Sequence, residues 1–294
     1  MSAPYPPVVR LLARLLGCAP AESLVAGAAV HFAYRPAWRD QQGVRVLGVA
    51  PSFPESLWRR LGVPFERHTA AELRLAALLR EPPRDRHLLV LAPEGLLHVR
   101  AWGTTHVTVD DGETVHSAVP EQVEARWARA VPPGIWYAVS RRRVRPSERT
   151  LWDGLLHNAH DMLVSSGAPQ GVDGIELWGE ALATWPEDLA WPAGAAATAA
   201  HIRETGSLWR QALAQALEAL APRLPVALRP APLLAACVEL WEEVADKLAQ
   251  AAAREDADAL VAARSRVLRL AGAESRLWSH IAEHARRALF DDQR

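Results

Sequence analysis

Apolar and polar positions follow two different patterns along the chain, and the change comes near residue 147. Before it, short apolar runs of strand length alternate with stretches whose apolar residues recur at helical spacing. The predicted strands are Val44–Ala50, His87–Ala92, Leu96–Trp102, Thr105–Asp110 and Ile135–Val139. The predicted helices are Val8–Leu16, Ala21–Ala29, Phe53–Leu61, Ala70–Leu79 and Gln122–Ala130. Gly103-Thr104 suits a tight hairpin, so residues 1–146 are predicted to form an α+β domain with a mainly antiparallel sheet.

Almost every periodic stretch after Pro146 is helical. The predicted helices are Leu151–Ser165, Ile175–Thr184, Leu208–Ala221, Leu233–Ala253, Ala257–Leu270 and Glu274–Leu289. Gly272 is expected to break the last two helices apart, and the Ala-rich stretch Ala193–Ala200 is interpreted as a short linker. Residues 147–294 are therefore predicted to form an all-helical domain whose last helices pack as an antiparallel bundle.

The composition is that of an ordinary globular protein. The 294 residues are half apolar, carry a net charge of −1 and include a single lysine, Lys247. This balance offers no basic patch to nucleic acid or to an anionic membrane surface. No apolar run approaches the length of a membrane span and no secretory leader is evident, so a cytoplasmic, bacterial protein is expected. Cys18 and Cys237 have no paired spacing, which predicts neither a disulfide framework nor a zinc cluster.

Five segments carry a resemblance to a known family. They are Leu11–Tyr34 (LLARLLGCAPAESLVAGAAVHFAY), Phe53–Gly62, Leu96–Gly112, Val123–Ala130 and Gly206–Arg210. In this order and spacing they resemble the butirosin-biosynthesis H-type acyltransferases, a papain-like family that moves acyl groups from carrier proteins onto amines. The resemblance implies a papain-like fold for residues 1–146, a helical C-terminal domain and a role in natural-product biosynthesis.

The nucleophilic cysteine of that family has no counterpart at the matching place. In the family a His-Cys pair lies about a dozen residues before the glycine that corresponds to Gly17. Here that window is Ser2–Pro7, with no Cys, Ser or Thr at the matching position. Cys18 lies roughly 13 positions further on, which is about 20 Å along a helix, so it cannot take the same place. The covalent chemistry of the family is therefore not expected in this chain.

The catalytic base is the second part of the resemblance. His98 is the nearest match to the family's histidine, but the family spacing to the glycine at Gly103 is one residue longer. A β-bulge would be needed to bring the side chain to the matching face of the strand. Asp110, or its neighbour Asp111, corresponds to the carboxylate that orients the histidine. Even without a thiol, His98 and Asp110 would form a general base and its orienting group, able to activate a substrate hydroxyl or amine directly.

Further candidates lie outside this pair. His31 is a third catalytic candidate, with a hydrogen-bonded buried histidine as the alternative. Twelve tryptophans stand against four phenylalanines and three tyrosines. Either Trp does the core packing usually shared with Phe, or an apolar cleft between the domains offers indole N–H groups to a ligand. On the second interpretation the substrate-binding candidates are Tyr34, Trp102, Trp136, Trp209 and Arg210.

Two histidine pairs and a basic run complete the candidates. His157 with His160, and His280 with His284, have helical spacing but no legible third ligand, so neither a metal nor a cofactor is predicted. The run Arg141–Arg145 is either a solvated linker or a docking place for the phosphopantetheine or an acidic helix of a carrier protein.

Three functional hypotheses follow. The first is an enzyme of specialised metabolism that acts on an acyl or polyketide/peptide intermediate, by acyl transfer, chain release or cyclisation, with non-cysteine acid–base chemistry in a cleft between the domains. The second is a non-catalytic family member that binds an intermediate or an acyl carrier protein. The third is a divergent enzyme with a constellation around His31 and the Trp-lined cleft. None involves nucleic acid or a membrane, and a homodimer is compatible with each.

Overall fold

A computed structural model describes residues 5–34, 46–49, 52–69, 85–92, 95–103, 105–130, 134–164, 169–188, 190–224 and 230–290. The chain forms two compact units. The sheet unit comprises Tyr5–Ser23 and Pro54–Pro146, and the helical unit comprises Met1–Pro4, Leu24–Phe53 and Ser147–Arg294. The segment Leu24–Phe53 thus groups with the later helices. The predicted helix Ala70–Leu79 lies outside the described residues.

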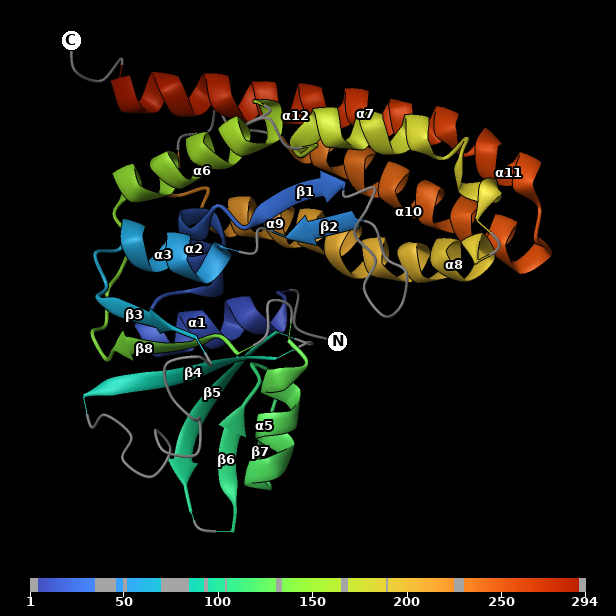
Figure 1. Cartoon of the computed structure of the whole chain (residues 1–294). Coiled ribbons are helices and arrows are strands. Elements are labelled where there is room, and N and C mark those ends of the chain that lie inside the picture. The colour runs from blue at the N-terminus through green and yellow to red at the C-terminus, as the bar shows by residue number, and fades with distance from the viewer. Residues whose placement is uncertain are drawn as a thin grey trace. The chain divides into compact units, whose positions relative to one another are not determined.

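Six antiparallel strands form the sheet, in the order β3-β8-β4-β5-β6-β7 (Figure 1). Their bounds are β3 Phe65–His68, β4 Arg86–Ala92, β5 Gly95–Trp102, β6 Val107–Asp110, β7 Val115–Ala118 and β8 Trp136–Ser140. The α+β class, the antiparallel sheet and its four central strands are confirmed. The two edge strands, β3 and β7, were not predicted, because most of their side chains are partly or fully exposed and show no apolar alternation.

The two faces of the sheet differ in chemistry because successive side chains of a strand point to opposite faces. His98 of β5 lies directly opposite Asp110 of β6, whereas their neighbours Val99 and Val109 lie opposite each other and point into the core. Helix α5 (Pro120–Ala128) contributes to this apolar side. The core cluster consists of Leu88, Val90, Val99, Val107, Val109, Ala118, Val123, Trp127, Trp136 and Ala138. The polar pair is therefore placed on the face away from that cluster.

Helix α1 (Pro7–Leu16) contacts the face of the sheet that carries His98 and Asp110, and it has clear sequence signals at both ends. It begins with Pro7, whose missing N–H costs nothing in a first helical turn. It ends at Gly17, which has a φ of 73° and donates its N–H to Ala13 O at 2.8 Å. The N–H of Val144 donates to Leu16 O at 2.9 Å, which ties the end of α1 to the segment after β8.

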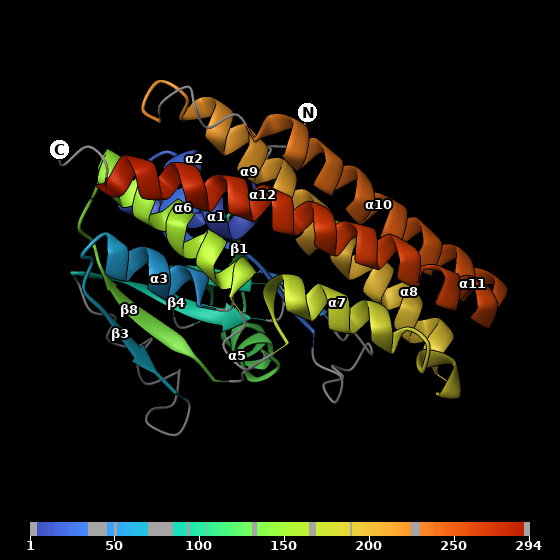
Figure 2. The same ribbon diagram turned by 90° about the horizontal axis from the view of Figure 1, so that it is seen from above.

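The helical unit combines a two-stranded antiparallel sheet with long helices, of which α12 runs along α6 and α7 (Figures 1 and 2). The strands are β1 Val30–Tyr34 and β2 Val46–Val49. The helices are α6 Glu148–Leu163, α7 Gly171–Ala181, η1 Trp185–Glu187, α8 Trp191–Ile202, the π-helix η2 Arg203–Ser207, α9 Leu208–Ala219, α10 Ala231–Arg254, α11 Ala257–Ala262 and α12 Arg264–Phe290. Two further helices, α2 (Pro20–Gly27) and α3 (Phe53–Arg60), contain residues of both units.

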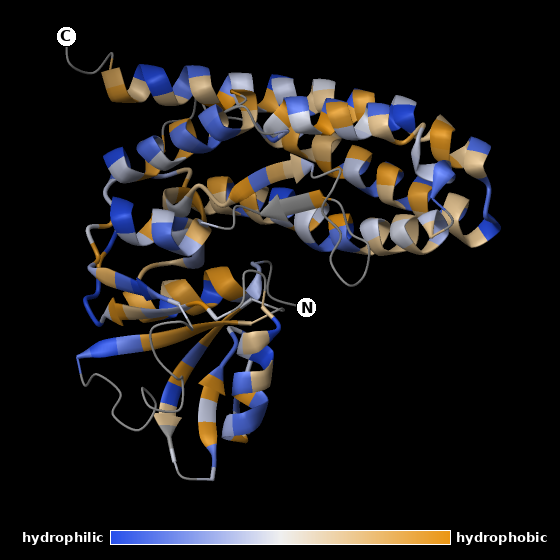
Figure 3. Cartoon of the chain, in the orientation of Figure 1, coloured by the Kyte–Doolittle hydropathy of each residue, from blue (hydrophilic) through white to orange (hydrophobic). Residues whose placement is uncertain are grey.

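Aromatic rings form the centre of the helical unit. Phe32 of β1 contacts Trp178 and Trp241, with ring centroids 5.8 and 5.7 Å apart, and all three side chains are fully buried. Hydrophobic and hydrophilic positions alternate along α10 and α12 in Figure 3, as expected for helices with one buried face. None of the described helices is both long and apolar enough to cross a membrane.

Two predictions in the helical part are wrong. The stretch Ala193–Ala200, interpreted as a linker, lies inside helix α8. Alanine has the highest helix propensity, so an Ala-rich stretch continues a helix readily. Gly272 does not end a helix, because α12 runs through it. An interior glycine costs about 1 kcal/mol, and the burial of neighbours such as Leu270 and Leu277 offsets that cost.

Candidate functional site

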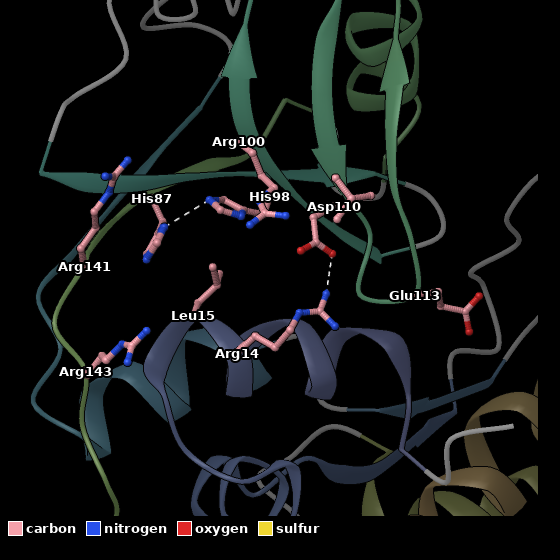
Figure 4. A pocket seen from close by; sticks show the side chains of 10 residues that line it. Arg14, Leu15, His87, His98, Arg100, Asp110, Glu113, Arg141 and Arg143 are labelled. Carbon is pink, nitrogen blue, oxygen red and sulfur yellow. Dashed lines mark hydrogen bonds and ion pairs between the residues drawn. The ribbon is translucent and has the colours of Figure 1, made fainter.

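A pocket of about 570 Å³ opens in the sheet unit (Figure 4). Its charged lining residues are Arg14, Arg100, Asp110, Glu113, Arg141 and Arg143. The remaining lining residues are His87, His98, Leu15 and Val115. They come from α1, from strands β4 to β7 with the turn between β6 and β7, and from the segment that follows β8. Two predicted catalytic residues, His98 and Asp110, therefore share one pocket.

Two histidines that line the pocket are in contact. His87 Nδ1 and His98 Nε2 are 3.1 Å apart, and the rings meet edge to face with centroids 4.9 Å apart. One ring therefore donates its N–H to the lone pair of the other. His98 is only 7% exposed, and its other nitrogen, Nδ1, has no hydrogen-bond partner within the described part of the chain. A buried polar atom without a partner is costly, and such atoms often mark functional sites.

The surroundings of His98 disfavour its protonated form. Burial is the largest cause, followed by the neighbouring His87, and together with Arg100 and Arg141 they lower the pKa of His98 to about 4. The carboxylate of Asp110 opposes this shift but does not cancel it. Burial and then Arg141 also lower the pKa of His87. Both imidazoles are therefore neutral at neutral pH.

Asp110 does not make the hydrogen bond to His98 that a catalytic pair requires. Its Oδ1 accepts from Arg14 Nη2 at 2.5 Å and from the Gly112 N–H at 3.0 Å. Asp111, the alternative orienting residue, accepts instead from the backbone N–H groups of Glu113 and Thr114, both at 2.8 Å. His98 and Asp110 are thus juxtaposed, while Arg14 occupies the carboxylate.

The β-bulge that the resemblance needs is present in β5. Val99 pairs with Val109 and Ala101 with Thr108, so one extra residue, Arg100, lies between two consecutive pairs. The bulge stands between His98 and Gly103, where the spacing is one residue short of the family pattern. The correspondence of His98 with the family's histidine remains a prediction.

The other predicted site residues lie elsewhere. His31 and Tyr34 are in β1, and Trp209 and Arg210 are in α9, so all four belong to the helical unit. Tyr34 is 1% exposed, and Trp209 meets Phe53 edge to face at 5.8 Å. The catalytic role of His31 and the substrate-binding roles of the other three residues stay predictions.

Two of the predicted substrate-binding residues belong to the sheet unit. Trp136 is buried in the core of the sheet unit and stacks on His68, with ring centroids 3.9 Å apart. Trp102 ends β5, but its side chain lies outside the described residues. The burial of most described tryptophans agrees with the interpretation that Trp does the packing usually shared with Phe.

Arg210 makes a fully buried ion pair. Its Nε donates to Glu274 Oε1 at 2.8 Å, and the guanidinium lies 5.0 Å from the centre of the Trp241 ring. Glu274 also accepts from the indole N–H groups of Trp241 and Trp278, both at 2.7 Å. Both charged side chains are 0% exposed, so in this structure they serve the helical core.

Sequence reasoning did not find Arg14, His87 or Arg100. A signal for His87 was present, because β4 and β5 are joined by a short connection. A tight hairpin at that point pairs Leu89 with His98 and brings His87, two residues away, to the same face. No comparable signal existed for Arg14, since it reaches the pocket from a helix distant in sequence.

The cysteines and the histidine pairs lie outside the pocket. Burial, and then the charge of Glu22, raise the pKa of Cys18 to about 12, and burial likewise raises the pKa of Cys237. His157 lies 3.4 Å from Asp161, and His280 contacts His284. No group of three His, Cys, Asp or Glu residues suited to a metal ion occurs among the described residues.

The depressed pKa of His98 predicts acid-sensitive stability. Its pKa is about 4 in the folded chain against an ordinary value of 6.5, so between these values the unfolded chain binds more protons. Stability should therefore fall by about 3 kcal/mol as the pH drops from 6.5 to 4. Urea unfolding across this range should show a smaller loss for His98→Asn than for the native chain. Equal losses in the two proteins would contradict the assignment.

Comparison with known proteins gives a family but no activity. Residues 123–281, more than half of the chain, match the family model described as Domain of unknown function (DUF4872). The match begins in α5 and ends in α12, so it includes Arg141 and Arg143 but not His87, His98 or Asp110. No curated protein matches the sequence. The chain therefore belongs to the DUF4872 family.

Proposed function

We propose that this protein acts on an acyl or polyketide/peptide intermediate of specialised metabolism by acid–base chemistry that needs no cysteine. The observation that carries the proposal is the juxtaposition of His98 and Asp110 on neighbouring strands in one pocket. The bulge between His98 and Gly103 supports the resemblance to papain-like acyltransferases, and a papain-like fold for the sheet unit is part of the proposal.

The reaction follows from the state of the two side chains. Neutral His98 accepts a proton from a substrate amine or hydroxyl as that nitrogen or oxygen bonds to the acyl carbon. The imidazolium then returns a proton to the leaving group, which for a carrier-bound thioester is the phosphopantetheine thiol. Asp110 stabilises the imidazolium through its charge, as it already raises the affinity of His98 for a proton. No acyl-enzyme intermediate forms on this route.

Substitution of His98 tests the catalytic role. With acyl thioesters of carrier proteins encoded beside its gene, His98→Asn should lower kcat/KM by about 10²–10⁴-fold, the usual contribution of a general base. His106→Asn is the matched control, because His106 is exposed in the turn after β5 and does not line the pocket. Cys18→Ala should retain full activity, and iodoacetamide should not inhibit.

Mass spectrometry separates this route from covalent catalysis. Intact-protein spectra during turnover should show no acyl adduct. An adduct, or inhibition that tracks alkylation of Cys18, would contradict the proposal. Full activity in His98→Asn would contradict it as well.

Binding without turnover is the second candidate function. Two observations favour it: Arg14 holds the Asp110 carboxylate, and His98 Nδ1 is left without a partner among the described residues. In that case native mass spectrometry should show a non-covalent complex with an unchanged intermediate or carrier protein, and no product should appear on prolonged incubation.

A further inference from the structure

The charges around the pocket do not balance. Two lining carboxylates face four lining arginines. Each carboxylate is already engaged by an arginine of α1: Asp110 by Arg14 at 2.5 Å, and Glu113 by Arg10 at 3.0 Å. The positive charge of the other arginines is therefore left without a counter-charge from the pocket's own acidic groups.

Three guanidinium groups remain for a ligand. Among the described residues, Arg100, Arg141 and Arg143 have no carboxylate partner. Within the described part of the chain, the Arg141 guanidinium makes one hydrogen bond, in which Nε donates to Arg86 O at 3.3 Å. The aliphatic carbons of Arg143 lie over Gly17, where a Cβ would come within 3.1 Å of its Cδ. The three side chains come from β5 and from the segment after β8, and they lie around the two histidines (Figure 4).

We propose that this pocket binds a small oxyanion, the phosphate or carboxylate group of a ligand, and that the His87–His98 pair takes up a proton when the anion binds. Planar guanidinium groups match the oxygens of phosphate and carboxylate, which favours arginine for this purpose. The inference goes beyond the proposed function, because binding of an anion requires no turnover.

Proton uptake follows from the charges that face the two rings. His98 is flanked by His87 from β4, Arg100 from its own strand, Asp110 from β6 and Arg141 from beyond β8. Arg14 and Glu113 complete the charged lining, and each is already in an ion pair. An anion held by the free arginines opposes their field, so the cost of a positive charge on an imidazole falls. The proton comes from solvent and adds to a ring nitrogen lone pair, and no bond breaks.

Sulfate is a suitable probe because its charge does not change between about pH 5 and pH 8. Isothermal titration calorimetry of the full chain should show saturable binding that is several-fold tighter at the lower pH. The heat should depend on the ionisation enthalpy of the buffer, which reports proton uptake. His98→Asn should bind sulfate with a much smaller pH dependence.

Single arginine substitutions locate the site. Arg141→Gln and Arg100→Gln should each weaken sulfate binding by about tenfold, the effect of one charge-assisted contact. Arg142→Gln is the matched control, because it removes the same charge from an exposed side chain that does not line the pocket. All three positions are exposed, so the variants should fold like the native chain, which circular dichroism checks.

The outcomes separate the possible ligands and the two proposals. Inorganic phosphate competing better than propionate would identify a phosphate site, and the reverse would identify a carboxylate site. Equal weakening by Arg142→Gln and Arg141→Gln, or binding that does not saturate, would overturn the inference. Because sulfate binding is measured without substrate, a native chain that turns over substrate but binds no sulfate refutes only the anion site. Retained binding with no turnover refutes only the catalytic proposal.

Discussion

Arg210→Met should lower the free energy of unfolding by about 3–5 kcal/mol, the usual cost of removing one partner of a buried ion pair. Arg210 and Glu274 are both 0% exposed, and Glu274 has no solvent to replace the guanidinium. The indole N–H groups of Trp241 and Trp278 would still donate to the carboxylate, but they carry no charge. Chemical denaturation measures the loss.

A matched pair of controls distinguishes burial from charge. Arg203 pairs with Asp246 at 2.6 Å, but both side chains are substantially exposed, so Arg203→Met should cost less than about 1 kcal/mol. Adding Glu274→Gln to Arg210→Met should recover part of the lost stability, because the unpaired buried charge is removed. If Arg210→Met and Arg203→Met lowered the free energy of unfolding equally, the buried pair would contribute no more to stability than the exposed one.

Gly112→Ala should destabilise the sheet unit by about 2–5 kcal/mol through two additive effects. Gly112 has a φ of 95°, which costs an L-residue about 1–2 kcal/mol. A Cβ there would come within 2.0 Å of Pro7 O, so α1 or the turn after β6 must move, at about 1–3 kcal/mol for overpacking. The Gly112 carbonyl also accepts from Arg10 and Arg14, so movement would loosen the α1 wall of the pocket.

Gly62→Ala separates the two effects. Gly62 belongs to the same unit and has a φ of 61°, but a Cβ added there would meet no heavy atom of the described residues within 4 Å. This variant should lose only the backbone contribution, about 1–2 kcal/mol. A larger loss for Gly62→Ala than for Gly112→Ala would contradict the argument from the Pro7 carbonyl.

The sequence pattern predicted the buried elements better than the exposed ones. The central strands were found because their apolar residues recur with a clear period, as at Leu88 and Val90. Strand β7 was missed because its side chains face solvent for the most part and its place depends on pairing with β6. The continuous helix through Gly272 was missed because tertiary packing outweighs local propensity.

Only the part of the candidate site that lies on neighbouring strands of one hairpin could be predicted from the sequence. His98 and Asp110 were singled out through the family resemblance, and the hairpin of β5 and β6 does place them opposite each other. The ion pair of Arg14 with Asp110 joins residues 96 positions apart, and no periodicity indicates such a contact. The same holds for the approach of Arg141 to the two histidines. From the sequence, a histidine–carboxylate pair was expected. The structure shows that the pocket around this pair also carries an excess of positive charge.

Along the chain, Leu24–Phe53 separates α1 from the rest of the sheet unit, and this separation affects how firmly α1 is held at the pocket. While the helical unit is folded, this segment contributes the paired strands β1 and β2 to it, and the chain from α1 to the rest of the sheet unit passes through them. If the helical unit unfolds, the same segment becomes a flexible tether of about 30 residues. Docking of α1 then carries a loop-closure entropy, and its effective concentration at the sheet falls. Arg14 would dissociate from Asp110 more often, although no atom of the pocket had been altered.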